Sequence, residues 1–376
     1  MARMSAFDVR VLGSGIVSRC VALVLAQQGL RIALQAKPAA AGLGAPSQED
    51  VRAYALNPAS VALLQRLKVW DALPLDARTT VLDMDVHGDA LGGHIAFSAW
   101  DHATEALAWI VDAAALESVL DTAASFAASV TVQPEPAAAA LTVVAEGKAS
   151  AQRAALGAQM QRHPYGHWAL AARLVSEQPH CGTARQWFRS PDILALLPFD
   201  RPEPQQSWGL VWSQPEAQAK DMLAWPVEQF EAALLEASQG AVGALRLASE
   251  RALWPLALAQ AEPVVGPGWA LVGDAAHVVH PLAGQGLNLG LADVLALDEV
   301  MAQREAWREL GDPALLARYV RKRRLATLTM AGGTDALWHL FASNAPGLRE
   351  LRNHGMSLVD RVAPLKRWLM GRAMSV

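Results

Sequence analysis

The segment from Trp269 to Asp298 constrains the fold more than any other part of the chain. It opens with the apolar run 270–272, which predicts a buried strand, and the run breaks at Gly273-Asp274. After the turn Gly284-Gln285-Gly286, apolar residues recur at helical spacing from Leu287 to Met301. Free N–H groups and the positive end of the helix dipole would meet at this turn. The segment therefore predicts an anion-binding corner.

The amino terminus predicts a βαβ unit. Alternating apolar residues at 7–11 indicate a strand, Gly13-Ser14-Gly15-Ile16-Val17-Ser18 follows, and a helical pattern leads to a second strand at Leu30–Leu34. This arrangement matches the dinucleotide fingerprint, in which the first two glycines allow a tight turn and close approach to a pyrophosphate. An ordinary βα turn that binds no ligand is the alternative interpretation.

Two positions depart from that fingerprint. Ser18 replaces the third glycine, and Gln35 stands where an acidic residue is expected at the end of the second strand. A Gln amide can hydrogen-bond a ribose hydroxyl, but without the charge assistance of a carboxylate. We therefore expect a dinucleotide that is held less tightly at its adenosine end.

Between these motifs the chain changes character twice. A helix is predicted at Pro58–Trp70, strands with Gly turns at 79–98, a helix at 112–128 with Asp112 as its N-cap, and a short strand at Leu141–Ala145. Short apolar strands at 165–213 suggest an antiparallel sheet, a helix follows around Met222–Ser238, and residues after 303 read as helical.

Composition narrows the function classes. A formal net charge of −4 gives no support for nucleic-acid binding. Two cysteines, Cys20 and Cys181, are too few for a disulfide framework and suit a reducing cytoplasm, with Cys20 as a small buried thiol. We find no signal peptide and no apolar window long enough for a transmembrane helix. Thirteen tryptophans are expected mainly in core packing, the alternative being that some line an apolar substrate pocket.

Both motifs together, GxGxxS near the start and GDAAHVVHPLAGQGLNLGLAD near the end, resemble the FAD-dependent aromatic monooxygenases. Similarity is greatest to the UbiH, UbiI and UbiF type hydroxylases of ubiquinone biosynthesis. Further matches at 51–57, Tyr165-Gly166, Trp187-Phe188, 194–198 and 348–367 extend the resemblance over nearly the whole chain.

The resemblance implies roles for particular residues. Gly13, Ser14, Gly15 and Ile16 would face the FAD pyrophosphate, with Gln35 near the adenosine ribose. Arg52 would contact the FAD phosphates or ribose, and Gly273-Asp274 the ribityl or phosphate region. The flavin ring would lie against a set drawn from the late motif: Pro281, Gly284, Gln285, Gly286, Leu287 and Asn288.

The family also carries an Asp-Gly motif that serves FAD and NAD(P)H, and here it reads Glu146-Gly147. The longer side chain must be accommodated there. The resemblance implies that NADH or NADPH reduces FAD, and that reduced flavin and O₂ hydroxylate a phenolic, polyprenylated quinone precursor. No residue is identified as the catalytic base, and oligomeric state is left open.

The predicted fold is α/β. A discontinuous Rossmann-like FAD-binding domain comprises residues 1–78, 104–164 and 265–340. An inserted, mostly antiparallel β-sheet substrate domain comprises residues 79–103 and 165–264, and C-terminal helices comprise residues 341–376. We expect the ligand between the two domains.

Competing sites are weaker. His277 and His280 at i, i+3 could share a metal on a helix, but no third ligand is near, so we predict no metal. No G-x-S-x-G nucleophile elbow supports a hydrolase. The basic run Arg321–Arg324 is expected to be a solvated helix face. The composition of the tail at 348–374 fits equally a terminal helix docked on the domain and a basic helix that binds a membrane surface or a biosynthetic complex. We therefore expect a cytoplasmic protein, and the alternative is a peripheral location at the inner membrane face.

Three other functions stay open at this point: another FAD oxidoreductase of the same fold, a flavoprotein subunit without turnover in a quinone-biosynthesis complex, and an NAD-dependent dehydrogenase. The Gln35 and Glu146 departures favour the second, whereas Gln35 and the Gly284–Asn288 corner disfavour the third.

Overall fold

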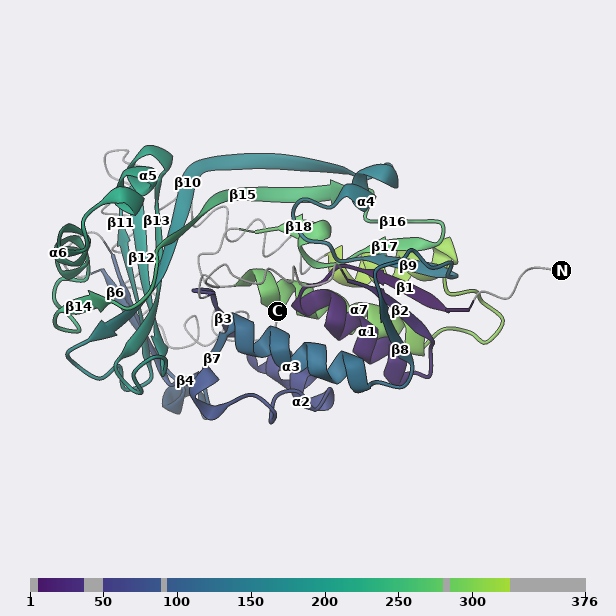
Figure 1. The fold of residues 1–376 in the computed structure, drawn as a ribbon, viewed down its shortest axis with the longest axis horizontal. Helices are drawn as coiled ribbons and strands as arrows, with labels where there is room; N and C mark the ends of the chain where they lie inside the picture. The colour runs from purple at the N-terminus through teal and green to yellow at the C-terminus, as the bar shows by residue number, and fades with distance from the viewer. Residues whose placement is uncertain (1–5, 37–49, 89–92, 280–284, 325–376) are drawn as a thin grey trace.

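The computed structural model describes residues 6–36, 50–88, 93–279 and 285–324. Two large sheets lie at opposite ends of the molecule, and a small third sheet lies between them (Figure 1). The α/β class and the mostly antiparallel second sheet that we predict are confirmed. The tail 341–376 lies outside the described residues.

The first large sheet is the nucleotide-binding type. Its strand order is β16-β17-β9-β1-β2-β8, and all neighbours are parallel except β16 and β17. The strands are β1 (Val9–Leu12), β2 (Ile32–Gln35), β8 (Val130–Gln133), β9 (Leu141–Val144), β16 (Val265–Gly266) and β17 (Trp269–Leu271). Strands from both ends of the chain thus share one sheet, since β17 pairs with β9 and β9 with β1.

The second large sheet has nine strands, and one parallel pair, β11 with β5, interrupts its antiparallel order. Along its main path the order is β18-β15-β10-β13-β12-β11-β5-β6, with β14 also paired to β10. The strands are β5 (Asp83–His87), β6 (His94–Ser98), β10 (Gln159–Ser176), β11 (Thr183–Arg189), β12 (Asp192–Phe199), β13 (Ser207–Pro215), β14 (Leu245–Leu247), β15 (Ala252–Glu262) and β18 (His277–Val278).

One strand of that sheet is much longer than the sequence indicates. The pattern predicts a short strand around Trp168, whereas β10 has 18 residues and pairs with β15 over most of its length. The two strands run together from the nine-stranded sheet toward the six-stranded sheet (Figure 1). Their register shifts between Pro164 and Trp168, because a proline cannot donate to the ladder and favours a bulge.

Helices cover the sheets. The first large sheet packs with α1 (Ile16–Gln27), α2 (Pro58–Arg66), α3 (Ala113–Phe126) and α7 (Gln285–Ala302) in one apolar core. The nine-stranded sheet packs with α5 (Glu216–Ala224) and α6 (Val227–Ala237) around the buried Trp187, Trp208 and Trp212. The short helix α4 (Ala151–Ala155) follows β9. A three-stranded sheet of β3 (Ala53–Leu56), β7 (Ala108–Asp112) and β4 (Arg78–Val81) lies between the larger ones.

Local chemistry explains two helix ends. Asp112 caps α3, as predicted, and its side chain accepts from the Ala115 N–H at 2.8 Å. The predicted helix to Trp70 is too long, since α2 ends at Arg66. Lys68 adopts φ +59°, and the Val69 N–H returns to the Leu64 carbonyl, a Schellman ending that stops the helix.

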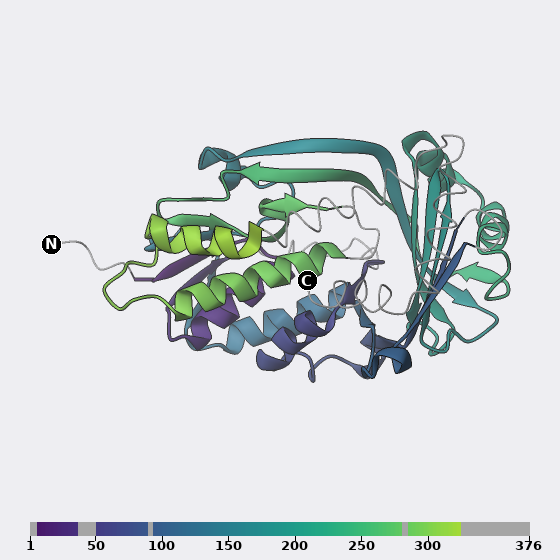
Figure 2. The ribbon, with the colours of Figure 1, turned by 180° about the vertical axis from the view of Figure 1, so that it is seen from behind.

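The last described helix, residues 313–324, lies beside α7 (Figure 2). Arg321, Lys322 and Arg324 of its basic run are exposed, as predicted for a solvated face, and Arg323 is the exception. Arg323 reaches back to α7, where its Nε donates to Asp293 Oδ1 at 2.6 Å and its Nη2 to the Leu289 carbonyl at 3.2 Å. Lys322 forms an ion pair with Glu299, also on α7.

The same helix is fastened to the first large sheet by a tyrosine. Tyr319 is fully buried, and its hydroxyl donates to the Leu271 carbonyl on β17 at 3.0 Å.

We predict that Tyr319→Phe lowers the free energy of unfolding by about 1–2 kcal/mol, because a buried carbonyl loses its partner. Urea unfolding measures this. The control is Trp307→Phe, because the Trp307 side chain is 73% exposed. An equal loss of unfolding free energy in both variants would contradict the prediction.

Candidate active site

A cavity of about 870 Å³ lies between the two large sheets. The parallel strands β1, β2 and β9 end at it, which is where open α/β sheets place their ligands. The cavity brings together most of the predicted site residues: Gly13, Ser14, Gly15, Ile16, Gln35, Arg52, Glu146, Gly147, Asp274, Gly286 and Leu287. Segments from the amino terminus and from beyond residue 270 therefore meet at one site.

The glycine turn after β1 is shaped for a close approach. Gly13 has φ +133°, and a Cβ there would stand 2.4 Å from the Ala145 carbonyl oxygen, so no other residue fits. A Cβ on Gly15 would meet no atom within 4 Å, because it would project into open space at the cavity. No side chain caps α1 at Gly15. The first-turn N–H groups of α1 are thus available to an anion, and this cradle fits a cofactor diphosphate.

Ser18, which replaces the third glycine, is accommodated inside the protein. It is fully buried on α1, and its hydroxyl donates to the Gly15 carbonyl at 2.7 Å. The serine hydroxyl, which a glycine would lack, therefore has a hydrogen-bond partner within the turn itself.

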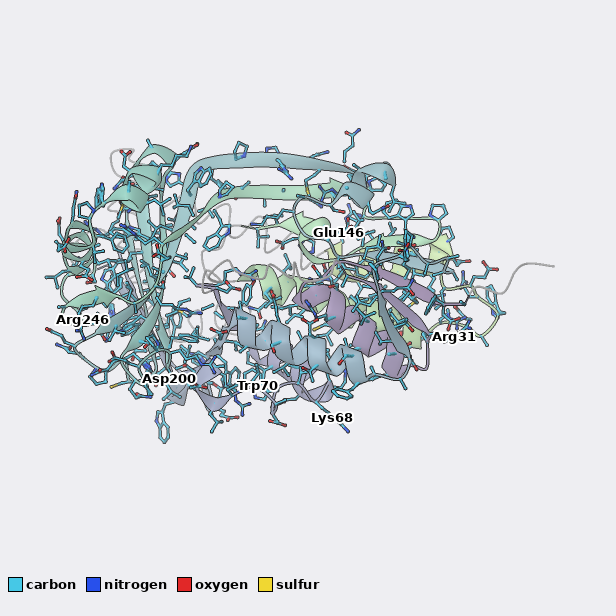
Figure 3. The ribbon with its side chains drawn as sticks, in the orientation of Figure 1. Arg31, Lys68, Trp70, Glu146, Asp200 and Arg246 are labelled. Atoms are coloured by element: carbon cyan, nitrogen blue, oxygen red, sulfur yellow. The ribbon has the colours of Figure 1, made fainter. Side chains whose placement is uncertain are left out.

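The other two departures, Gln35 from the fingerprint and Glu146 from the family's Asp-Gly motif, both line the cavity. Gln35 ends β2, and its Nε2 donates to the Pro134 carbonyl at 3.2 Å. Glu146 follows β9 at the end of the sheet that faces the nine-stranded sheet (Figure 3). Its carboxylate accepts from the Ser150 hydroxyl at 2.7 Å and from the Gln152 N–H at 3.3 Å, so its longer side chain is turned to the start of α4.

Asp274 stands at the cavity in the 3₁₀ turn η3 (Gly273–Ala275). Burial raises the pKa of its carboxyl, although Lys148 and His277 act in the opposite direction. Gly273 does not itself line the cavity. It has φ +63° and packs against Val17, where a Cβ would be 3.3 Å from the valine side chain.

A buried carboxylate on α7 holds this turn in place. Asp293 Oδ2 accepts from the Gly273 N–H at 2.9 Å and bonds His277 Nε2 at 2.7 Å, while Oδ1 accepts from Arg323. Burial alone would raise the pKa of Asp293, but His277, Arg323 and the Gly273 N–H together hold it below its usual range. These bonds fix the turn that carries Asp274.

His277 does not lie on a helix, as the metal interpretation required. His277 lies in the strand β18 and binds Asp293, whereas His280 lies outside the described residues. Within the described ranges no cluster of three potential metal ligands occurs.

Only part of the predicted ring-binding turn can be placed. Gly286 and Leu287, in the first turn of α7, line the cavity, and a Cβ on Gly286 would enter open space. Gln285 begins the helix, while Pro281 and Gly284 lie outside the described residues.

Asn288 does not line the cavity, unlike its neighbours. Its side chain is buried and links α7 to the start of α2: Oδ1 accepts from the Asn57 N–H at 3.0 Å and from the Ser60 hydroxyl at 2.8 Å, and Nδ2 donates to the Ala55 carbonyl. Its position in the motif is explained by this junction, which sets how α7 meets β3.

The wall opposite the glycine turn is apolar. The nine-stranded sheet contributes small side chains such as Ala169, Ala171, Ala184, Ala195 and Val211, together with Trp254 at the side. Among the described lining residues of that sheet, Arg185 alone is ionisable, and Asp85 pairs with it at 2.9 Å. Trp254 is thus a cavity tryptophan, whereas Trp187, Trp208 and Trp212 serve the core, as expected for most of them.

Several lining residues were missed from sequence. Glu117 on α3, Lys148 after Glu146-Gly147, and Arg185 on β11 all reach the cavity. Lys148 follows the Glu-Gly motif by one position, which could have indicated it. Glu117 and Arg185 carry no local signal, because only tertiary packing brings α3 and β11 to the site.

Comparison with known proteins agrees with this geometry. A family model described as an FAD binding domain matches residues 99–331. The ubiquinone hydroxylase UbiL of Rhodospirillum rubrum is 31% identical over 98% of this chain and 89% of its own. The 3-demethoxyubiquinol 3-hydroxylase of Escherichia coli is 29% identical, with 98% of both chains covered. The crystal structure of p-nitrophenol 4-monooxygenase PnpA from Pseudomonas putida shares the fold at a TM-score of 0.75 and 17% identity, again with 98% of both chains covered.

These findings define a flavin-dependent enzyme. The chain belongs to the FAD-binding family that the matching model describes, and our predictions of that family and of FAD as the cofactor are confirmed.

The open space beside Gly15 gives a test of the cradle. Gly15 has an extended backbone, φ −93° and ψ −178°, which any residue adopts. We predict that Gly15→Val folds with an unchanged melting temperature but binds FAD at least tenfold more weakly, because its side chain fills space that the diphosphate needs. Gly13→Ala, which would clash with Ala145, should instead lower the melting temperature. A yellow Gly15→Val protein with normal FAD affinity would contradict the assignment.

The Asp293 cluster predicts a pH dependence. A carboxyl whose pKa is lowered on folding adds stability above its unfolded pKa, and that stability is lost as pH falls through the folded value. We expect Asp293→Asn to lower the free energy of unfolding at pH 7 by about 3 kcal/mol, because Arg323 loses its buried counter-charge. Urea unfolding between about pH 3 and pH 7 should show a weaker acid dependence in the variant than in the wild type; parallel curves would refute this.

Proposed function

We propose that this protein is an FAD-dependent hydroxylase that acts on the aromatic ring of a ubiquinone precursor, with NADH or NADPH as reductant. The observation that carries the proposal is one cavity with two unlike ends. A cradle of glycines and helix starts lies at one end, and a wide apolar wall lies at the other. Relatives named as a ubiquinone hydroxylase and a 3-demethoxyubiquinol 3-hydroxylase, aligned over 98% of the chain, support the substrate class.

In the proposed arrangement the protein's residues bind, orient and exclude water. Gly13, Gly15 and the start of α1 hold the diphosphate, and Arg52 supplies a cation beside it. The first turn of α7, at Gly286 and Leu287, presents the positive end of a helix dipole, which favours negative charge on the reduced cofactor. FAD itself supplies the redox chemistry and the activation of oxygen.

The apolar wall selects the substrate and excludes water. Small residues such as Ala169 and Ala195 leave room for a ring with a bulky apolar substituent. Among the described residues of this wall, the charged one, Arg185, is neutralised by Asp85. A neutral, apolar phenolic substrate therefore fits better than a carboxylated one, and low water content limits wasteful loss of the activated oxygen.

The reaction balances as one substrate C–H, one O₂, one NAD(P)H and one proton, giving one C–OH, one water and one NAD(P)⁺. One oxygen atom enters the ring and the other leaves as water. No additional oxidant or reductant is required.

We predict that the FAD-loaded protein oxidises NADH or NADPH faster when a demethoxy- or demethylated ubiquinol precursor is present, and that ¹⁸O from ¹⁸O₂ appears in the product. Anaerobic reduction by the nucleotide tests the first step, and admission of ¹⁸O₂ followed by mass spectrometry of the product tests the second. FAD binding without reduction by either nucleotide would instead indicate a subunit that has no turnover. That alternative is favoured by Glu146, whose carboxylate is engaged by Ser150.

Association with a membrane surface or with other biosynthetic proteins belongs to the same proposal. It rests on the apolar substrate expected here and on the basic composition of the tail at 348–374, which lies outside the described residues. Within the described part of the chain, no helix is long and apolar enough to cross a bilayer.

A further inference from the structure

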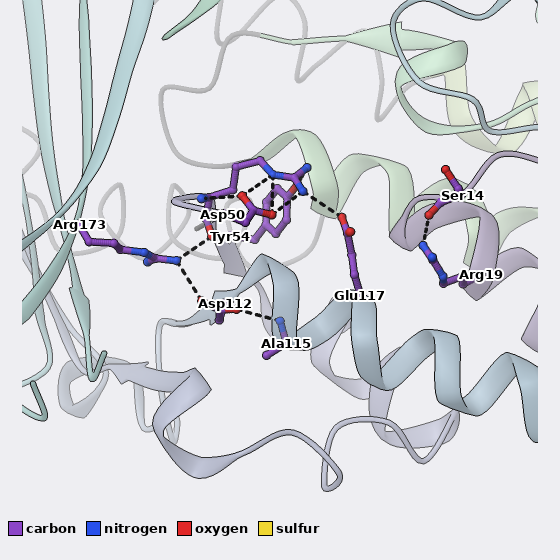
Figure 4. Close-up of polar contacts among 9 residues, drawn as sticks. Ser14, Arg19, Asp50, Tyr54, Asp112, Ala115, Glu117 and Arg173 are labelled. Carbon is purple, nitrogen blue, oxygen red and sulfur yellow. Dashed lines mark hydrogen bonds and ion pairs between the residues drawn. The ribbon is translucent and has the colours of Figure 1, made fainter. Parts of the chain in front are cut away.

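The arginine at the polar end of the cavity already has anionic partners. Arg52 Nε donates to both carboxylate oxygens of Asp50 at 2.8 and 3.0 Å, and Nη2 donates to Asp50 Oδ2 at 2.6 Å. Nη2 also donates to Glu117 Oε1 at 3.2 Å, and Nη1 to the Tyr54 hydroxyl at 3.2 Å (Figure 4). One guanidinium therefore faces two carboxylates, which leaves the group with a formal charge of −1.

The two carboxylates hold Arg52 in different ways. Asp50 lies two residues away and also accepts from the Arg52 N–H at 3.0 Å, so it forms a local clamp. Glu117 comes from α3, makes one longer bond to the guanidinium, and lines the cavity, whereas Asp50 does not. Glu117 is thus the partner that stands where a ligand would approach the arginine.

The scaffold fixes Glu117 and Arg52 relative to each other. The buried Arg173 of β10 donates through Nη2 to the Arg52 carbonyl at 2.8 Å and to Asp112 Oδ2 at 3.2 Å (Figure 4). Asp112 in turn caps α3, the helix that carries Glu117. The start of β3 and the start of α3 are therefore tied to one buried cation, and the Glu117–Arg52 pair does not depend on the side chains alone.

The same helix carries a matched carboxylate that serves the glycine turn. Asp121, one helical turn after Glu117, pairs with Arg19 Nε at 2.5 Å, and Arg19 also donates to the Ser14 carbonyl. Asp121 does not line the cavity. Its bond supports an arginine that holds the turn from behind, so Asp121 and Glu117 differ in location although they share a helix face.

We propose that Glu117 is a built-in competitor for the phosphate groups of FAD. It pairs with Arg52 in the protein without cofactor, gives up that pairing when the diphosphate arrives, and thereby sets how tightly FAD is held. The physical reason is that both donors of Nη2 are taken by Asp50 and Glu117, so an anionic ligand that binds Nη2 from the cavity replaces Glu117 and then remains near the charge it has displaced. The proposal rests on the FAD placement given above, with its diphosphate toward Gly13, Gly15 and Arg52.

The test is FAD binding by the cofactor-stripped protein, measured by quenching of flavin fluorescence. Glu117→Gln keeps the shape and one acceptor for Arg52 but removes the charge. We expect its dissociation constant for FAD to fall roughly three- to tenfold, as for removal of a repulsive charge at a part-buried site. Asp121→Asn removes the same charge one turn away and should give no such tightening.

Salt provides a second readout that a merely structural role would not move. In the wild type, FAD exchanges one anion for another on Arg52, so added NaCl has little net effect at this position. In Glu117→Gln the phosphate meets an arginine with one fewer counter-charge, so affinity should fall more steeply between about 50 and 500 mM NaCl.

Three results would overturn the proposal: equal or weaker FAD binding by Glu117→Gln, equal tightening by Asp121→Asn, or identical salt slopes in wild type and Glu117→Gln. Weaker binding would assign Glu117 to a direct attractive contact with the cofactor instead. None of these measurements needs turnover. A protein that binds FAD as described but does not hydroxylate would refute the proposed function and leave this inference standing.

Discussion

The buried carboxylate of Asp293 joins three parts of the chain that the active site requires. It receives the Gly273 N–H from the turn after β17, His277 from β18 and Arg323 from the helix at 313–324. A buried charge is stable only when such partners surround it, and removing any of them leaves the others with unmet charge or hydrogen-bonding capacity. The placement of Asp274 at the cavity follows from these bonds, because its turn has no freedom once Gly273 is held. Close packing reinforces this, since a Cβ on Gly290 of α7 would come within 2.9 Å of Val17.

Those parts of the fold that depend on local pattern could be predicted from the sequence. The βαβ start, the Asp112 cap and the strand leading to Gly273 arise from periodicity and turn chemistry within short windows. Errors occurred where distant contacts decide the outcome. The extent of β10 depends on its pairing with β15, and the contact of Arg323 with α7 depends on Asp293, thirty residues earlier. Lys68 ends α2 through a left-handed conformation that its residue type does not signal.

The candidate site shows the same division. Gly13 could be assigned because backbone geometry demands a glycine there, since a Cβ would clash with the Ala145 carbonyl, whereas Gly15 and Gly286 are explained by the open space beside them at the cavity. Asn288 was expected at the flavin, yet it joins α7 to α2, since a motif does not distinguish a residue that contacts a ligand from one that supports it. Glu117 was not anticipated at all. Its importance appears only when α3 places it beside Arg52, and Arg173 extends that arrangement to the wall of the nine-stranded sheet.

The paired strands β10 and β15 have a mechanical consequence. Their shared ladder runs from Gln159 paired with Glu262 to Ala171 paired with Ala252. The same two strands therefore begin beside the six-stranded sheet and form part of the apolar wall of the cavity. Any movement of the nine-stranded sheet relative to the six-stranded sheet would have to bend two hydrogen-bonded strands at once. The register shift between Pro164 and Trp168 is the place where this strand pair bends most easily. Two continuous, hydrogen-bonded strands therefore connect the cradle to the wall, and their pairing helps to set the distance between them.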